Sequence, residues 1–232
     1  MPGFAPIHPV VGVQPFNTLF VPDTTQRWTL GMVMDAVDPY FGYGRFVYGK
    51  AVAAQAPGTM VNMSEVWTAT AAASTAGLGL PVYWAAQNFA INTFGWYQIE
   101  GVIPATTSAA VTAGAAVGIG TAGNLSGTVA IGKQVLGIRV NQIGTFAITK
   151  ANSITTNGSP VIGVQNVEGL FVGLTLSGTG IAAGTISTID PSGRFITSTA
   201  NSTATGSVTL TATYTNYCLV TAQNAFQQGQ IV

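Results

Sequence analysis

Charge is what this sequence has least of. Seven Lys and Arg and seven Asp and Glu make up only 6% of the 232 residues, against about a quarter in an average globular protein. A soluble monomer normally keeps mixed charge on its surface. We therefore expect much of this surface to be covered by other copies of the chain or by a larger assembly. The basic residues are dispersed, which argues against nucleic acid as a partner, since phosphate binding needs a clustered basic stripe.

Histidine and cysteine are almost absent, with one of each, His8 and Cys218. A lone cysteine rules out an intrachain disulfide, and its flanking residues, NYCLV, predict a buried strand in which Cys218 is a small core residue. Catalytic triads and zinc sites need His, Cys or carboxylates placed together. The sequence shows no such pattern, so we expect no enzymatic activity, no metal site and no cofactor.

Neither a secretory signal nor a membrane helix is predicted. The first ten residues, MPGFAPIHPV, contain no Lys or Arg and no continuous apolar run, unlike a signal peptide. Two long charge-free runs, 66–99 and 101–132, are interrupted by Gly, Pro, Thr, Asn and Gln, so they would make poor transmembrane helices. We expect synthesis in the cytoplasm and no membrane partner.

The first 27 residues predict an extended arm. Five of the eleven prolines fall within residues 1–26, and proline at this density prevents helix formation and removes backbone donors from a sheet. The segment is nonetheless too apolar for a solvated tail. We expect it to lie along its own subunit or a neighbour. It supplies six candidate interface residues: Phe4, Ile7, His8, Val11, Phe16 and Phe20.

From Trp28 onward the sequence has the two-residue periodicity of β-strands. Residues 28–52 predict a hairpin, with its turn in PYFGYG at 39–44, where Pro and Gly supply the turn chemistry. Asp35 and Asp38 flank this turn. Turn capping is the commoner role for such residues, and a cation held between them is the alternative.

Composition divides the rest of the chain. Residues 28–147 predict a β body domain, a β-sandwich or barrel-like fold. Residues 148–213 are rich in Thr, Ser, Asn and Gly and predict a small β-module of short strands, with a β-turn at DPSG, 190–193. Residues 214–232 recover the apolar character and predict a closing body strand followed by a tail. The fold class is therefore all-β, with the module inserted between two body strands.

The run FGWYQIEGVI, residues 94–103, predicts a long body strand. Strict alternation places Trp96, Gln98 and Glu100 on one side and Tyr97 and Ile99 on the other. A carboxylate in such a strand needs a partner or a place at the edge of an interface. The surrounding aromatic residues are typical of a core or a subunit contact, and a stacking platform for sugars is the alternative.

Three segments make the chain resemble structural proteins of tailed bacteriophages, and most of all capsid decoration (cement or head-stabilising) proteins. They are the hairpin at 29–53 with the run FGWYQIEGVIPA, the module segment at 167–211, and the closing LVTAQNAFQQG at 219–229. Proteins of this family bind the outer capsid surface and stabilise the shell by bridging neighbouring capsomers. The resemblance implies a location on the virion and the major capsid protein as partner. It also implies a homo-oligomer, with a trimer favoured over a dimer.

In that setting Trp96, Gln98 and Glu100 would face a subunit or capsid contact, and Glu100 would pair across it with Arg45 or Arg139. The resemblance brings no catalytic residues with it. The alternative is a phage tail or head fibre, or another adhesin, whose module at 148–213 binds a glycan or receptor on the host surface.

Overall fold

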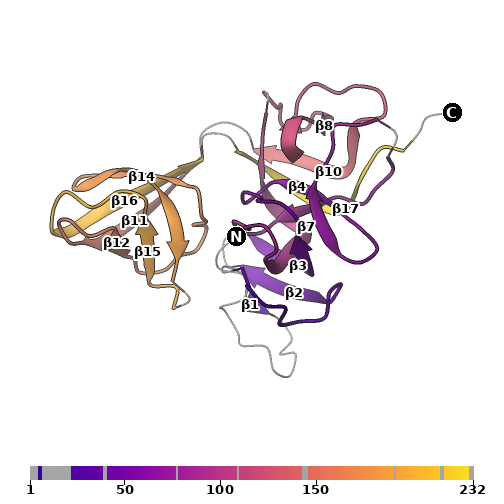
Figure 1. Cartoon of the computed structure of the whole chain (residues 1–232). Coiled ribbons are helices and arrows are strands. Elements are labelled where there is room, and N and C mark those ends of the chain that lie inside the picture. Colours follow the sequence, from indigo (N-terminus) through magenta and orange to yellow (C-terminus); the bar gives the residue numbers. More distant parts are fainter. Residues whose placement is uncertain are drawn as a thin grey trace.

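The structure is a computed structural model that describes residues 5–6, 22–38, 41–76, 78–108, 110–142, 146–190, 192–214 and 217–229. These residues form β-strands joined by turns, with a single 3-10 turn at Thr121–Gly123. The prediction of an all-β chain is confirmed. Figure 1 shows the strands gathered into two lobes, a large sheet and a smaller closed barrel.

The larger lobe, called the body below, is a sheet of eleven strands. Ten come from the first 142 residues and the last is the C-terminal strand β17. They are β1 (Ala5–Pro6), β2 (Val33–Asp38), β3 (Gly42–Ala51), β4 (Met60–Met63), β5 (Thr68–Ala71), β6 (Tyr83–Ala85), β7 (Phe94–Thr106), β8 (Val117–Ile119), β9 (Leu125–Ser126), β10 (Gln134–Gln142) and β17 (Tyr217–Gln227). Their spatial order is β1-β2-β3-β5-β4-β6-β7-β17-β10-β8-β9.

Part of the body sheet closes on itself. Because β3 pairs with β7 as well as with β2 and β5, the strands β3, β5, β4, β6 and β7 form a ring. All five contribute to one buried cluster: Val47, Ala51, Val61, Ala69, Ala85, Phe89 and Tyr97. A second and larger cluster contains Phe46, Tyr48, Trp84 and Trp96 and extends to β8, β10 and β17. The body is thus built around two adjoining apolar cores.

The predicted hairpin is confirmed, since β2 and β3 pair as antiparallel neighbours from Val33↔Val47 to Asp38↔Gly42. At the outer edge of β2, Ala5 and Pro6 pair with Val37 and Ala36, so these two residues of the arm lie along their own chain. The six candidate interface residues of the arm lie outside the described residues: Phe4, Ile7, His8, Val11, Phe16 and Phe20.

A buried carboxylate fixes the chain to the body where the arm ends. Asp23 exchanges backbone hydrogen bonds with Phe94 at the start of β7. Its side chain accepts a hydrogen bond from the Tyr48 hydroxyl at 2.8 Å and pairs with Arg27 Nε at 2.8 Å. Burial raises the pKa of Tyr48, so this hydroxyl remains a donor throughout the physiological range.

The smaller lobe is a closed barrel of six strands. They are β11 (Phe146–Thr155), β12 (Val161–Gly163), β13 (Thr175–Gly178), β14 (Ile181–Ile189), β15 (Phe195–Ser198) and β16 (Gly206–Tyr214), in the order β11-β12-β15-β14-β13-β16. The barrel has an apolar core of its own, which includes Ile162, Leu170, Phe171, Ile196 and Leu210. Its strands run from residue 146 to 214, and the strands on either side of it, β10 and β17, pair with each other. The barrel is therefore inserted between two neighbouring body strands.

The predicted turn at 190–193 is confirmed in its described residues. The Ser192 N–H donates to Asp190 Oδ1 at 2.8 Å, and the Gly193 N–H donates to the Asp190 carbonyl at 2.9 Å. Gly193 has φ +68, which glycine adopts without strain. The hydrogen bonds from Ser192 lower the pKa of Asp190.

Cys218 is buried in β17, within the larger body core, as the sequence predicts. Burial raises its pKa to about 11, so the thiol stays protonated at neutral pH, and the thiolate is the reactive form. We expect iodoacetamide in mildly alkaline buffer to leave the native protein unmodified and to alkylate Cys218 fully in denaturant, as measured by intact mass. Rapid alkylation of the native protein would contradict this placement.

Candidate functional site

The candidate site is built on β7 and its neighbour β3. Their pairing is interrupted by a bulge at Ile99, because Arg45 lies opposite Glu100 while the next residue, Phe46, lies opposite Gln98. β7 therefore has one extra residue at this point. Such an insertion reverses the side of the sheet to which the following side chains point.

The bulge places Gln98 and Glu100 on opposite faces of the sheet. Cross-strand partners share a face, whereas the neighbours Arg45 and Phe46 point to opposite faces. Gln98 therefore lies with Phe46 in the core, and Glu100 lies with Arg45 on the partly exposed face. The strict alternation predicted for this strand, with Gln98 and Glu100 on the same side, is wrong at the bulge.

Trp96 and Gln98 are core residues, which corrects their predicted position at an intermolecular contact. Both side chains are fully buried. Trp96 packs edge-on against Tyr48, with 5.2 Å between ring centroids. The Gln98 amide donates to the carbonyl oxygens of Glu100 and Val102 at 2.9 and 3.3 Å. Side chains enclosed in this way by their own chain are not accessible to another molecule.

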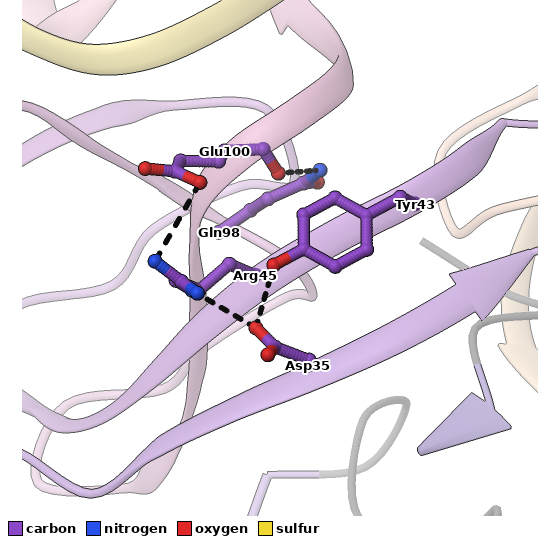
Figure 2. A network of polar contacts seen from close by, with 5 residues as sticks. All are labelled: Asp35, Tyr43, Arg45, Gln98 and Glu100. Carbon is purple, nitrogen blue, oxygen red and sulfur yellow. Dashed lines mark hydrogen bonds and ion pairs between the residues drawn. The ribbon is translucent and has the colours of Figure 1, made fainter. Parts of the chain in front are cut away.

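Glu100 belongs to a polar network on the exposed face of β2 and β3, shown in Figure 2. Arg45 Nε donates to Asp35 Oδ1 at 2.9 Å, and the Tyr43 hydroxyl donates to the same oxygen at 2.8 Å. Arg45 Nη1 lies 3.8 Å from Glu100 Oε2. One of the two predicted partners of Glu100 is therefore present, but it lies in the same chain and not across a subunit contact.

Two members of the network have shifted pKa values, Arg45 and Tyr43. The hydrogen bond from Arg45 to Asp35 raises the pKa of the guanidinium. Partial desolvation and the hydrogen bond to Asp35 raise the pKa of Tyr43, which leaves the phenol as a neutral donor. Arg45 thus stands between two carboxylates, and three of the fourteen charged residues of the chain meet at one place.

Exposed apolar side chains flank this network. Val33 and Val37 precede and follow Asp35 on the same face of β2, and Tyr43 is the cross-strand partner of Val37. Their exposed fractions are 49% for Val33, 41% for Val37 and 42% for Tyr43. Exposed apolar and aromatic groups around a paired arginine are typical of protein–protein contact surfaces. We call this surface the β2–β3 face: Val33, Asp35, Val37, Tyr43, Arg45 and Glu100.

Sequence reasoning missed most of the β2–β3 face, although a signal is present. In VMDAVD, residues 33–38, Met34 and Ala36 alternate with Val33, Asp35 and Val37. Both alternating sets are mostly apolar, so the pattern shows a strand without showing which side is buried. Asp35 is the informative residue, because an ionised side chain favours the solvent side.

The described residues bring together no group of three or more His, Cys, Asp or Glu side chains that could hold a metal ion. The two carboxylates of the β2–β3 face, Asp35 and Glu100, are bridged by Arg45. Within the described ranges, no helix has the length and apolar character to cross a lipid bilayer.

Comparison of the chain with protein-family models, with curated proteins and with solved structures found no match. The surfaces of the molecule itself are therefore the basis for a functional proposal.

Proposed function

We propose that this chain is a non-enzymatic structural protein of a bacteriophage virion, which binds the outer capsid surface and stabilises the shell by bridging neighbouring capsomers. The observation that carries the proposal is the β2–β3 face, where exposed apolar side chains surround a paired arginine in a chain with only 6% charged residues. The major capsid protein is the proposed partner at this face. The start of the arm, Ala5–Pro6, pairs along the same strand β2.

The energetics of a repeated contact support this role. Burial of apolar surface contributes roughly 25 cal/mol per Å², so the exposed parts of Val33, Val37 and Tyr43 supply a modest amount at each contact. A shell repeats the contact many times, and linked contacts reinforce one another. The formal net charge of zero limits repulsion between close-packed identical copies. The resemblance to decoration proteins favours a trimer over a dimer for these copies.

The proposal is tested with heads of the encoding phage that lack this protein. Purified protein is mixed with the heads, and bound protein is measured after sedimentation. We expect Val37→Lys to weaken binding by about tenfold or more, because a charge would be buried against the capsid. Ile131→Lys, which introduces the same charge at an exposed body residue away from β2 and β3, is the control and should bind normally.

Two results would count against the proposal in different ways. Normal binding by the Val37→Lys variant would show that another surface contacts the capsid. Failure of the unaltered protein to bind heads, or a virion content of a few copies instead of a number comparable with the capsid subunits, would reject the function itself.

A further inference from the structure

The barrel carries a hollow on its surface, separate from the β2–β3 face. It has a volume of about 580 Å³, within the range of roughly 300–1,000 Å³ that is usual for small-molecule sites. It is lined by residues of β11, β12 and β15 and by the turns beside them. Ile154, Gly163 and Phe195 lie side by side across these three strands, as successive cross-strand partners.

The large apolar side chains that the described part of the barrel exposes all meet in this hollow. They are Ile154, Val161 and Phe195, with exposed fractions of 54%, 44% and 48%. Single exposed apolar residues are normal on a protein surface. Three of them gathered around one depression, on a module whose other surface strands are rich in Thr and Ser, indicate a binding surface.

Gly163 keeps the centre of the hollow open. It lies between Ile154 and Phe195, and a Cβ atom added there would stand 3.6 Å from Ile154 Cβ and 3.7 Å from Phe195 Cε1. These are ordinary van der Waals distances. A larger residue would therefore fit the backbone but would fill the space between the two side chains.

Polar groups line the same hollow, and the charged residue among them is an arginine, Arg194. Arg194, Asn152 and Gln165 contribute to the wall, which contains no Asp or Glu. Among the described residues, ion pairs to carboxylates are formed by Arg27 and Arg45 and not by Arg194. A guanidinium without a carboxylate partner, next to an apolar surface, is complementary to a ligand that combines an apolar face with an anionic group.

We propose that this hollow binds a saccharide that carries a carboxylate. The C–H face of a pyranose ring would stack on Phe195 and pack against Ile154 and Val161, and its carboxylate would pair with Arg194. The amides of Asn152 and Gln165 are suited to the hydroxyl groups at the ring edge. A site of this kind would let a decorated capsid attach to acidic saccharides on a cell surface, which goes beyond stabilisation of the shell.

The strand pairing favours a saccharide over an extended acidic peptide. At Gly163 the strand β12 is paired on both sides, with Ile154 of β11 and with Phe195 of β15. The centre of the hollow therefore offers no free edge for an added strand, the usual means by which a sheet binds an extended peptide. A ligand at this point is held by side chains.

The test uses the full-length protein with two acidic probes, 3′-sialyllactose and trigalacturonic acid, and two neutral ones, lactose and maltotriose. Binding is followed by calorimetry and by saturation-transfer NMR. We expect at least one acidic probe to bind about tenfold or more tightly than its neutral counterpart. Arg194→Gln should remove this preference, and Phe195→Ala should weaken binding of acidic and neutral probes alike.

Matched variants separate the hollow from general effects of charge and folding. Arg139→Gln removes an exposed arginine of β10 and should leave binding unchanged. Gly163→Leu should block binding while the circular dichroism spectrum and melting temperature stay close to those of the unaltered protein. The proposal is overturned if neither acidic probe binds, if an acidic peptide binds in place of the saccharides, or if Arg194→Gln and Arg139→Gln behave alike. Capsid binding is proposed for a different surface, the β2–β3 face. The capsid-binding result and the saccharide-binding result can therefore fail separately.

Discussion

Gly101→Ala is expected to destabilise the body by about 3 kcal/mol, from a strained backbone and a steric clash together. Gly101 follows the bulge in β7 with φ +104, a conformation that residues with a side chain rarely adopt. A Cβ atom there would stand 2.2 Å from the Tyr43 carbonyl oxygen and 3.0 Å from Gly44 Cα. Both neighbours are backbone atoms of β3, so relief would require the two strands to separate.

Urea unfolding followed by tryptophan fluorescence measures this effect in the body alone, because the four tryptophans, at positions 28, 67, 84 and 96, all precede the barrel. Gly42→Ala is the matched control. Gly42 also has a positive φ, +75, but a Cβ atom there would meet nothing within 4 Å. We expect the control to cost about 1 kcal/mol. Equal losses for the two variants would argue against close contact between Gly101 and β3.

Trp96→Ala is expected to cost about 3–5 kcal/mol of body stability, because it removes a fully buried aromatic side chain and leaves a cavity. Trp96 lies in the larger body core and packs against Tyr48. Denaturant midpoints, read from the fluorescence of the three remaining tryptophans, give the loss of stability.

Trp96→Phe provides the comparison, since it keeps a ring in the same space and should cost about 1–2 kcal/mol. The pair of variants also distinguishes a core residue from a contact residue. If Trp96 were exposed on an intermolecular contact, Trp96→Ala would weaken assembly and leave the monomer as stable as before. A large loss of monomer stability is expected instead.

Local patterns in the sequence predict the features that depend on neighbouring residues. The hairpin of β2 and β3 and the turn at Asp190 are encoded by Pro, Gly and Asp at fixed positions, and both form as expected. The change in composition near residue 148 predicts the inserted module, whose strands begin at Phe146 and end at Tyr214. Turn chemistry and composition act over a few residues, so a single sequence carries enough information for them.

Features that depend on distant strands are not predictable in this way. The bulge at Ile99 exists because β3 pairs with β7, and that pairing joins residues 44 to 57 positions apart, from Lys50 with Phe94 to Gly44 with Gly101. The bulge reverses the face of Glu100 relative to Gln98, so Trp96 and Gln98 lie in the core while Glu100 stays on the β2–β3 face. The ring of β3, β5, β4, β6 and β7 also depends on this long-range pairing of β3 with β7.

Adjacent apolar residues explain why the hollow of the barrel escaped sequence reasoning. Phe195 and Ile196 follow one another in β15, and the structure exposes the first and buries the second. The same holds for Val161 and Ile162 in β12. The residue types alone do not say which of two apolar neighbours lies inside a barrel, because the curvature and closure of the sheet decide it.

The position of β17 has a consequence for the order in which the chain folds during synthesis. β17 is the last strand of the body sheet to be made, yet it lies between β7 and β10, so the sheet becomes continuous from β7 to β10 only after residues 217–227 have been synthesised. The barrel needs only the residues up to Tyr214 and closes first.

Once closed, the barrel holds Phe146 and Tyr214 as cross-strand neighbours. It thereby converts a long flexible connection between β10 and β17 into a short one, which lowers the entropic cost of bringing these strands together. The inserted barrel thus brings the start of β17 close to the end of β10, where β17 pairs in the sheet.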